Sequence, residues 1–145
     1  MLQEISIRTM RITDAETVNA LTKQLGYNIS AEQTKNNIEA ILSNKYCEAF
    51  VAIFNNEVAG WITATSVVTL ESPPFCEVRG LVVDEQLRNK KIGKKLIEKV
   101  MEWSRSKNAE RLVVKCNMIR KETHAFYRHL RFAEKKEQKV FEIYV

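Results

Sequence analysis

Apolar residues recur along this chain with two different periods, and the changes between them predict the secondary structure. Apolar runs rich in β-branched and aromatic residues predict strands near residues 5–10, 49–54, 58–64, 77–83 and 111–117, with a closing pair that ends at 140–145. Apolar residues three and four positions apart predict four helices between them. The resulting order, β-α-α-β-β-β-α-β-α-β-β, predicts an α/β (α+β) fold with a mixed sheet in a single domain, residues 1–145.

Local signals set the ends of several elements. Capping boxes predict helix starts at Thr13 and Ser30, and Gly26 predicts the end of the first helix. Asn55 and Asn56 predict a two-residue hairpin between strands 49–54 and 58–64, because asparagine tolerates the left-handed conformation such a turn requires. The helix between strands 77–83 and 111–117 forms a crossover, so these two strands are expected to be parallel.

Composition narrows the class of protein. A chain of 145 residues is long enough to bury a core without metal or disulfide support. Its three cysteines are scattered and odd in number, which predicts reduced thiols and no metal site. The sequence has no apolar run of the roughly 20 residues that a membrane span needs. It also has no signal-peptide pattern at its start. We therefore expect a cytoplasmic protein with no membrane partner.

Positive charge is concentrated where strand 77–83 leads into the third helix. The formal net charge is +5, and five lysines lie within ten residues: Lys90, Lys91, Lys94, Lys95 and Lys99. The first-turn N–H groups of a helix lack intrahelical partners and carry the positive end of the helix dipole, so they bind anions. Added cations suit a diphosphate better than a lone carboxylate, which favours a phosphorylated cofactor. A solvated helix start and a general polyanion patch are the alternative interpretations.

The chain resembles the GNAT superfamily of acetyl-coenzyme A-dependent N-acetyltransferases over nearly its whole length. Three patterns carry the resemblance. Val82-Val83-Asp84 leading to Arg88-Asn89-Lys90-Lys91-Ile92-Gly93 is similar to the family's pyrophosphate loop. Asn117 ends the next strand, and residues 125–132 resemble the family's closing segment around a Phe-Tyr pair. Lys91 and Arg131 stand where the family usually has glycine, and a side chain in a left-handed conformation costs roughly 1 kcal/mol.

The resemblance implies acetyl-coenzyme A as cosubstrate and assigns residues to it. Main-chain groups of the strand end would bind the acetyl and pantetheine portion, and the loop with the helix start would bind the diphosphate. Asn117 would contact the pantetheine arm. The residues implied to bind the cofactor are Leu81, Val82, Val83, Arg88, Asn89, Lys90, Lys91, Ile92, Gly93, Lys94, Asn117 and Tyr127.

Two residues are implied to be catalytic. Tyr127 occupies the family's tyrosine position and is the candidate general acid for the coenzyme A thiolate, although its spacing from Leu130 also fits simple packing. Glu77 lies on the strand that ends at the cofactor and is the candidate general base, directly or through water. Strand alternation places Glu77 and Arg79 on one face, so a surface ion pair is the alternative interpretation.

The main hypothesis is therefore an N-acetyltransferase in which a primary amine attacks acetyl-coenzyme A directly within a ternary complex. The acceptor is a small molecule or a peptide, and its identity stays open. A non-catalytic acyl-coenzyme A-binding module of the same fold is the first alternative. A basic nucleic-acid-binding domain is a weaker one, since the aromatic stacking pattern of RNA modules is missing. Residues 141–145 favour strand pairing between two copies in a homodimer.

Overall fold

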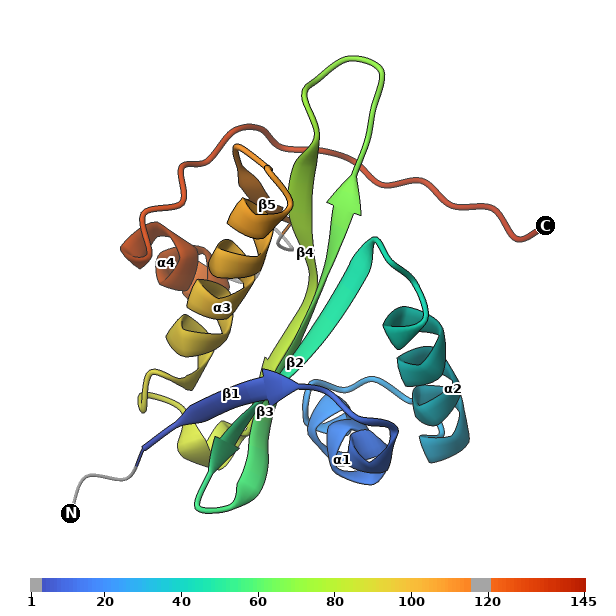
Figure 1. The fold of residues 1–145 in the computed structure, drawn as a ribbon, viewed down its shortest axis with the longest axis vertical. Coiled ribbons are helices and arrows are strands. Elements are labelled where there is room, and N and C mark those ends of the chain that lie inside the picture. The colour runs from blue at the N-terminus through green and yellow to red at the C-terminus, as the bar shows by residue number, and fades with distance from the viewer. Residues whose placement is uncertain (1–3, 116–120) are drawn as a thin grey trace. The chain divides into compact units, whose positions relative to one another are not determined.

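A five-stranded sheet with the order β1-β2-β3-β4-β5 forms the centre of residues 1–115 in the computed structural model (Figure 1). Residues 4–115 and 121–145 are described, and the chain divides into two compact units, residues 1–115 and 116–145, which are treated separately below. The strands are β1 Ser6–Thr9, β2 Cys47–Phe54, β3 Glu57–Val67, β4 Phe75–Val83 and β5 Leu112–Val114. The helices are α1 Ala15–Gln24, α2 Ala31–Leu42, α3 Ile92–Ser106 and, in the second unit, α4 Lys121–His129.

The sheet is mixed, as the sequence predicts. Neighbouring strands from β1 to β4 pair antiparallel, whereas β4 and β5 pair parallel through the crossover that contains α3. In the described chain this parallel pairing joins residues 76–78 to 112–114, so the last four residues of β4 pair only with β3. Asn117, expected at the end of the fifth strand, lies outside the described residues.

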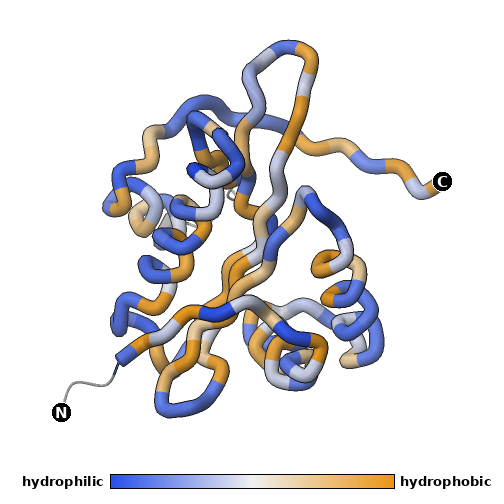
Figure 2. Tube along the Cα trace, in the orientation of Figure 1, coloured by the Kyte–Doolittle hydropathy of each residue, from blue (hydrophilic) through white to orange (hydrophobic). Residues whose placement is uncertain are grey.

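Helices cover both faces of the sheet. Figure 1 shows α3 on one side and α1 with α2 on the other, and Figure 2 shows that the strands between them are mostly apolar with some polar positions. The core under α1 and α2 contains Met10, Ala15, Val18, Ile38, Ala49 and Val51. On the opposite face the buried side of α3 consists of Ile92, Leu96, Ile97 and Val100. No helix in the described part of the chain is long and apolar enough to cross a membrane.

Most local signals act as expected. Ser30 caps α2, since its hydroxyl accepts a hydrogen bond from the Gln33 N–H at 3.0 Å. Asn55 and Asn56 have φ values of 53° and 63°, the left-handed pair that the β2–β3 hairpin requires. The capping box expected at Thr13 is wrong. Instead a short 3₁₀ turn precedes α1, and Asp14 at the N-cap binds Arg8 and the Arg11 N–H.

The closing pair of strands is also a wrong prediction. Residues 132–145 contain no strand or helix, and α4 is the last regular element. A strand needs a partner for its backbone hydrogen bonds, and the apolar side chains at the end of this segment are 85–120% exposed: Val140, Phe141, Ile143, Tyr144 and Val145. β-propensity alone therefore does not form a strand there.

Candidate functional site

The end of β4 is shaped by a β-bulge and by a close helix contact. Gly80 pairs with Thr63 and Val78 with Ala64, so Arg79 is the extra residue of the bulge. Gly60 lies on the neighbouring strand β3, opposite the end of β4. A Cβ on it would lie 2.8 Å from the carbonyl oxygen of Val82 and 3.3 Å from side chains of α3. Glycine at this position therefore lets α3 approach the strand end directly.

Contacts with the end of α1 hold the loop that follows β4. The side-chain oxygen of Gln24 accepts a hydrogen bond from the Glu85 N–H at 2.9 Å. Asp84 caps a short 3₁₀ turn, Glu85–Leu87, by accepting from the Gln86 N–H at 3.1 Å. Its own N–H donates to the Ala59 carbonyl at 2.8 Å. The first half of the loop is thus fixed between α1 and β3.

The second half of the loop leads into α3 without a side-chain cap. Lys91 is the N-cap residue and makes no capping hydrogen bond, and no acidic residue lies in the first turn. The first intrahelical bond described runs from the Lys95 N–H to the Lys91 carbonyl at 3.1 Å. The N–H groups of the first three helical residues are thus free of intrahelical partners, as at any helix start. Arg88, Asn89, Lys90, Lys91 and Lys94 are exposed around them.

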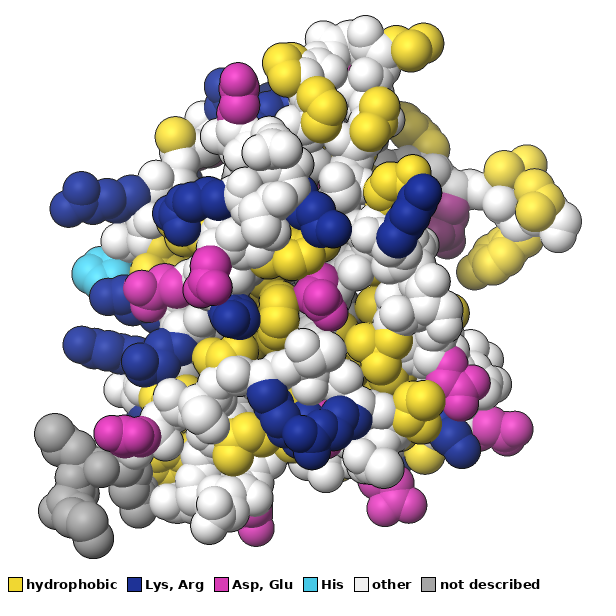
Figure 3. Space-filling view, viewed as in Figure 1, with side chains coloured by type: hydrophobic (Ala, Val, Ile, Leu, Met, Phe, Trp, Pro, Cys, Tyr) yellow, Lys and Arg dark blue, Asp and Glu magenta, His cyan; other side chains and the backbone are white. Residues whose placement is uncertain are grey.

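Lys91 adopts the left-handed conformation that is expected at a position where the family usually has glycine. Its φ and ψ are 65° and 20°, in the left-handed region. Asn89, two residues earlier, also has a positive φ of 72°. The loop therefore keeps a glycine-like backbone in spite of the Cβ, and the side chain of Lys91 adds a cation beside the helix start. Figure 3 shows Lys and Arg side chains over α3.

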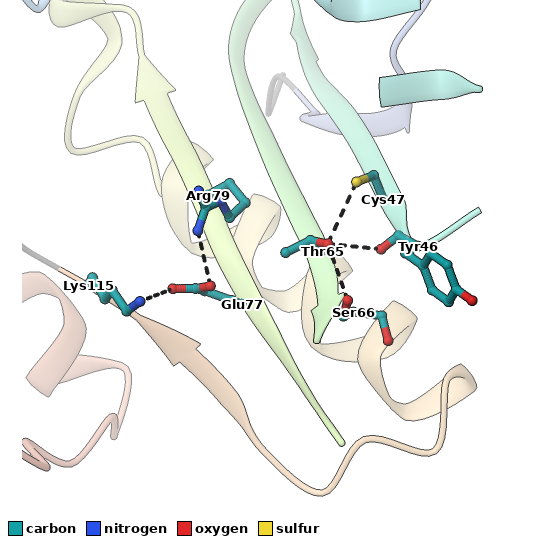
Figure 4. Close-up of polar contacts among 7 residues, drawn as sticks. All are labelled: Tyr46, Cys47, Thr65, Ser66, Glu77, Arg79 and Lys115. Atoms are coloured by element: carbon teal, nitrogen blue, oxygen red, sulfur yellow. Dashed lines mark hydrogen bonds and ion pairs between the residues drawn. The ribbon is translucent and has the colours of Figure 1, made fainter. Parts of the chain in front are cut away.

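A second polar group lies on β4 and the neighbouring end of β5 (Figure 4). Glu77 is 6% exposed, and its two carboxylate oxygens contact two cations. Arg79 Nη1 donates to Oε2 at 3.2 Å, and Lys115 Nζ lies 3.1 Å from Oε1. The ion pair with Arg79 that strand alternation predicts is present. Glu77 itself is buried, although the alternative interpretation placed it on the surface.

The second unit holds Tyr127 in an aromatic cluster. The Tyr127 ring is 7% exposed and makes edge contacts with Phe126 and Phe132, with centroids 5.1 and 5.4 Å apart. α4 ends in a Schellman motif, in which the Phe132 N–H donates to the Tyr127 carbonyl and the Arg131 N–H to that of Arg128. Arg131 has a φ of 71° at the position where glycine is usual.

Sequence reasoning missed Lys115 and Gln24. Lys115 comes into contact with Glu77 only through the β4–β5 register, in which Glu77 pairs with Val113. Lys115 could have been found by applying strand alternation to the predicted fifth strand and placing that strand parallel to the strand of Glu77. Gln24 contacts a loop 61 residues away in the sequence, and no local pattern predicts that.

Other features give no site of their own. An open groove of about 360 Å³ lies between β1, β2 and α3, and none of the residues of the β4–α3 loop lines it. Among the described residues, no group of three or more His, Cys, Asp or Glu side chains is placed to hold a metal ion. Cys47 and Cys76 are free thiols.

Comparison with known proteins identifies the family. The model of the acetyltransferase (GNAT) family matches residues 14–132. This match covers most of the sequence, so the chain belongs to the GNAT acetyltransferase family. A search of curated proteins finds no match.

Solved structures share the fold at low sequence identity. The aminoglycoside N-acetyltransferase AAC(6')-Iy in complex with CoA is 21% identical, with a TM-score of 0.88 over 99% of this chain and 97% of that chain. A transcriptional regulator from Bacillus halodurans C-125 is 17% identical, with a TM-score of 0.85 over 97% of this chain and 100% of the other. A GNAT family acetyltransferase from Staphylococcus aureus is 17% identical, with a TM-score of 0.79 over 96% and 98%. The mixed α/β fold is therefore that of GNAT proteins.

Proposed function

We propose that this protein is an N-acetyltransferase that moves an acetyl group from acetyl-coenzyme A to a primary amine, by direct attack in a ternary complex. The observation that carries the proposal is the start of α3. The helix begins from a left-handed residue without a side-chain cap, and it presents N–H groups and exposed cations next to the end of β4. There β4 pairs with β3 but with no described residue of β5. A solved relative of the same fold is a complex with CoA.

In this proposal, the diphosphate of the cofactor binds the loop and the helix start. The N–H groups of residues 92–94 and the Arg88 and Lys91 side chains are its donors. Main-chain groups of Leu81, Val82 and Val83 bind the acetyl and pantetheine portion, because β4 has no β5 partner there among the described residues. Asn117 is assigned to the pantetheine arm from the family resemblance alone.

Acetyl transfer from an ammonium group needs the nitrogen to lose two protons, one before it attacks and one as the amide forms. The sulfur gains one proton, so one proton passes to solvent. The nitrogen lone pair attacks the thioester carbonyl, the C–S bond breaks, and coenzyme A leaves as a thiolate. Glu77, directly or through water, is proposed to accept the proton of the amine, because a lysine-like amine with a pKa of about 10 is mostly protonated at neutral pH. Tyr127 is proposed to protonate the thiolate. No thiol–base pair suggests an acyl-enzyme among the described residues, where Cys47 bonds to Thr65.

The acceptor belongs to the same proposal. One solved relative is a complex with a bisubstrate analogue, CoA-S-monomethyl-acetylneamine, which supports a small-molecule amine as the acceptor class. A cytoplasmic location is proposed as well, supported by the free thiols Cys47 and Cys76.

Calorimetric titration with acetyl-coenzyme A tests the cofactor site. We expect saturable one-site binding, and we expect Gly93→Trp to abolish it because a bulky side chain would fill the space at the helix start. Absence of binding at millimolar cofactor would overturn the proposal and favour a different ligand.

Thiol release in the presence of amines then tests turnover. Tyr127→Phe should lower kcat more than 10-fold, in the range of general acid catalysis, and should change cofactor affinity much less than kcat because the ring is kept. Binding without thiol release from any amine would instead support the non-catalytic module of the same fold.

A further inference from the structure

One face of the β4–β5 pair carries an excess of cations around a buried carboxylate. Glu77 directly opposes Val113 in the parallel register, so side chains two residues from either one share its face outside the bulge. Arg79 is the bulge residue, and its ion pair with Glu77 places it on the same face. The side chains on this face are Phe75 and Arg79 along β4, with Arg111 and Lys115 flanking β5. Three cations and one carboxylate therefore lie on this face of the two strands.

Glu77 holds two of these cations in place from a buried position. Its side chain is 7% exposed, whereas those of Arg79 and Lys115 are 59% and 66% exposed. Each of its oxygens contacts a different cation, as Figure 4 shows. Solvent therefore meets the ammonium and the guanidinium, and the negative charge that fixes them lies beneath.

Arg111 extends the cationic surface along the same face. Its guanidinium lies 4.4 Å from the centroid of the Phe75 ring, and it donates to the Ser72 hydroxyl at 3.3 Å. Arg79 uses Nη1 for Glu77, and a guanidinium has five N–H donors, so most of its donors remain for another oxyanion. The group as a whole, Glu77, Arg79, Arg111 and Lys115, has a formal charge of +2.

We propose that the acceptor carries a carboxylate as well as the amine, and that Arg79 and Lys115 bind this carboxylate. This inference rests on the proposed acetyl transfer and names the substrate class of that site. An amino acid or a peptide with a free carboxylate has the required charges. A polycationic amine would be repelled by the three cations, because the group as a whole is positively charged.

Matched pairs of acceptors test the proposal. Linear ω-amino acids of increasing length are compared with their primary amides, which keep the amine and remove the negative charge. Thiol release gives kcat/KM for each compound, and calorimetry in the presence of coenzyme A gives the affinity of each N-acetyl product. The variants are Arg79→Gln and Lys115→Gln. Lys107→Gln, which removes an exposed lysine just after α3, is the matched control.

We expect the best acid to exceed its amide by about 10-fold or more in kcat/KM, the range for hydrogen bonds to a charged group. The ratio should fall toward one in Arg79→Gln and in Lys115→Gln and stay unchanged in Lys107→Gln. Amides or diamines that react as well as the acids would overturn the proposal, and so would a ratio that both variants leave unchanged.

The calorimetric measurement of N-acetyl product binding tests the carboxylate site independently of the proposed acetyl transfer. If cofactor binds but no amine releases thiol, acetyl transfer fails as the function. Tighter binding of N-acetyl acids than of amides, lost in both variants, would still support the carboxylate site. Equal binding of the two series would overturn it.

Discussion

Lys91 and Arg131 show how a single residue can occupy a glycine position without changing the backbone. Their φ values are 65° and 71°, at an N-cap and in a Schellman motif respectively. A left-handed conformation costs a residue with a Cβ roughly 1–2 kcal/mol, so the surrounding structure must hold it. At Lys91 the added cation lies beside a helix start that has no acidic residue, which favours an anion there.

Replacing Lys91 tests how much strain this residue holds. Lys91→Gly should leave the free energy of unfolding between unchanged and about 1 kcal/mol higher, because relief of strain outweighs the greater freedom of the unfolded chain. Lys90→Gly, at a residue without positive φ, should lower it by about 0.5–1 kcal/mol. Urea unfolding measures both values. Equal losses in the two variants would contradict a strained Lys91.

Asp14 is a buried carboxylate whose ionisation stabilises the fold. Burial alone would raise its pKa, but hydrogen bonds from Arg8 and the Arg11 N–H together hold the pKa below its usual value. A lowered pKa in the folded state gives stability that is present above the unfolded pKa of about 4. This stability is lost as the pH falls through the folded pKa.

Asp14→Asn should therefore lower the free energy of unfolding by about 2 kcal/mol at pH 7, since it leaves Arg8 without its charged partner. The difference between the two proteins should begin to shrink below about pH 4, because the carboxyl of the unfolded wild-type chain takes up a proton there. It should be lost only as the pH falls through the lower pKa of the folded state. Denaturant unfolding across this pH range measures the difference. A gap between the proteins that stays constant down to pH 2 would rule out a role for this ionisation.

Residue patterns in the sequence predict the contacts of the candidate site only where those contacts are local. Alternation along one strand places Arg79 beside Glu77. The family's glycine at the position of Lys91 predicts the left-handed backbone of that residue. Lys115 was missed because its contact depends on the register between β4 and β5, which is set by the packing of the whole crossover. Burial of Glu77 was missed for the same reason.

At the scale of elements, turns and helix ends were predicted where a short polar motif determines them. The Asn55-Asn56 hairpin and the Ser30 cap form as expected. The Thr13 capping box fails because Asp14 binds Arg8, a partner on β1 that no local motif includes. The closing strands fail because strand formation depends on an available edge as well as on propensity.

The approach of α3 to the sheet depends on Gly60. A Cβ there would meet the Val82 carbonyl oxygen at 2.8 Å, and backbone cannot yield as a flexible side chain does. Gly60→Ala should lower the free energy of unfolding by about 2 kcal/mol or more and weaken cofactor binding, because it moves the strand end and α3 apart.

Gly26→Ala is the matched control for Gly60→Ala, because it adds the same methyl group away from α3. A Cβ at Gly26 meets no atom within 4 Å, but its φ is +90°, so the expected loss is about 1 kcal/mol of strain with cofactor affinity unchanged. Urea unfolding and calorimetry measure both variants. Unchanged cofactor binding in folded Gly60→Ala would show that the helix–strand contact does not shape the site.

At the scale of the whole molecule, charge and stability are linked through the proposed ligand. The chain has a formal net charge of +5, and exposed cations surround the start of α3. A ligand that binds only the folded state raises the free energy of unfolding by about 2.7 kcal/mol at 100 times its Kd. Acetyl-coenzyme A should therefore raise Tm in proportion to the logarithm of its concentration.

The dependence of the Tm increase on salt concentration shows how much of it comes from contacts between cations and the diphosphate. The Debye length falls from about 10 Å at 0.1 M salt to about 3 Å at 1 M, so exposed cations attract an anion less strongly at high salt. The Tm increase from acetyl-coenzyme A should shrink with salt, and it should shrink less in a double Lys91→Gln, Lys94→Gln variant. Differential scanning calorimetry measures both effects. A ligand shift that salt leaves unchanged would mean that pantetheine contacts along β4 hold the cofactor, and the cations at α3 would then need another explanation.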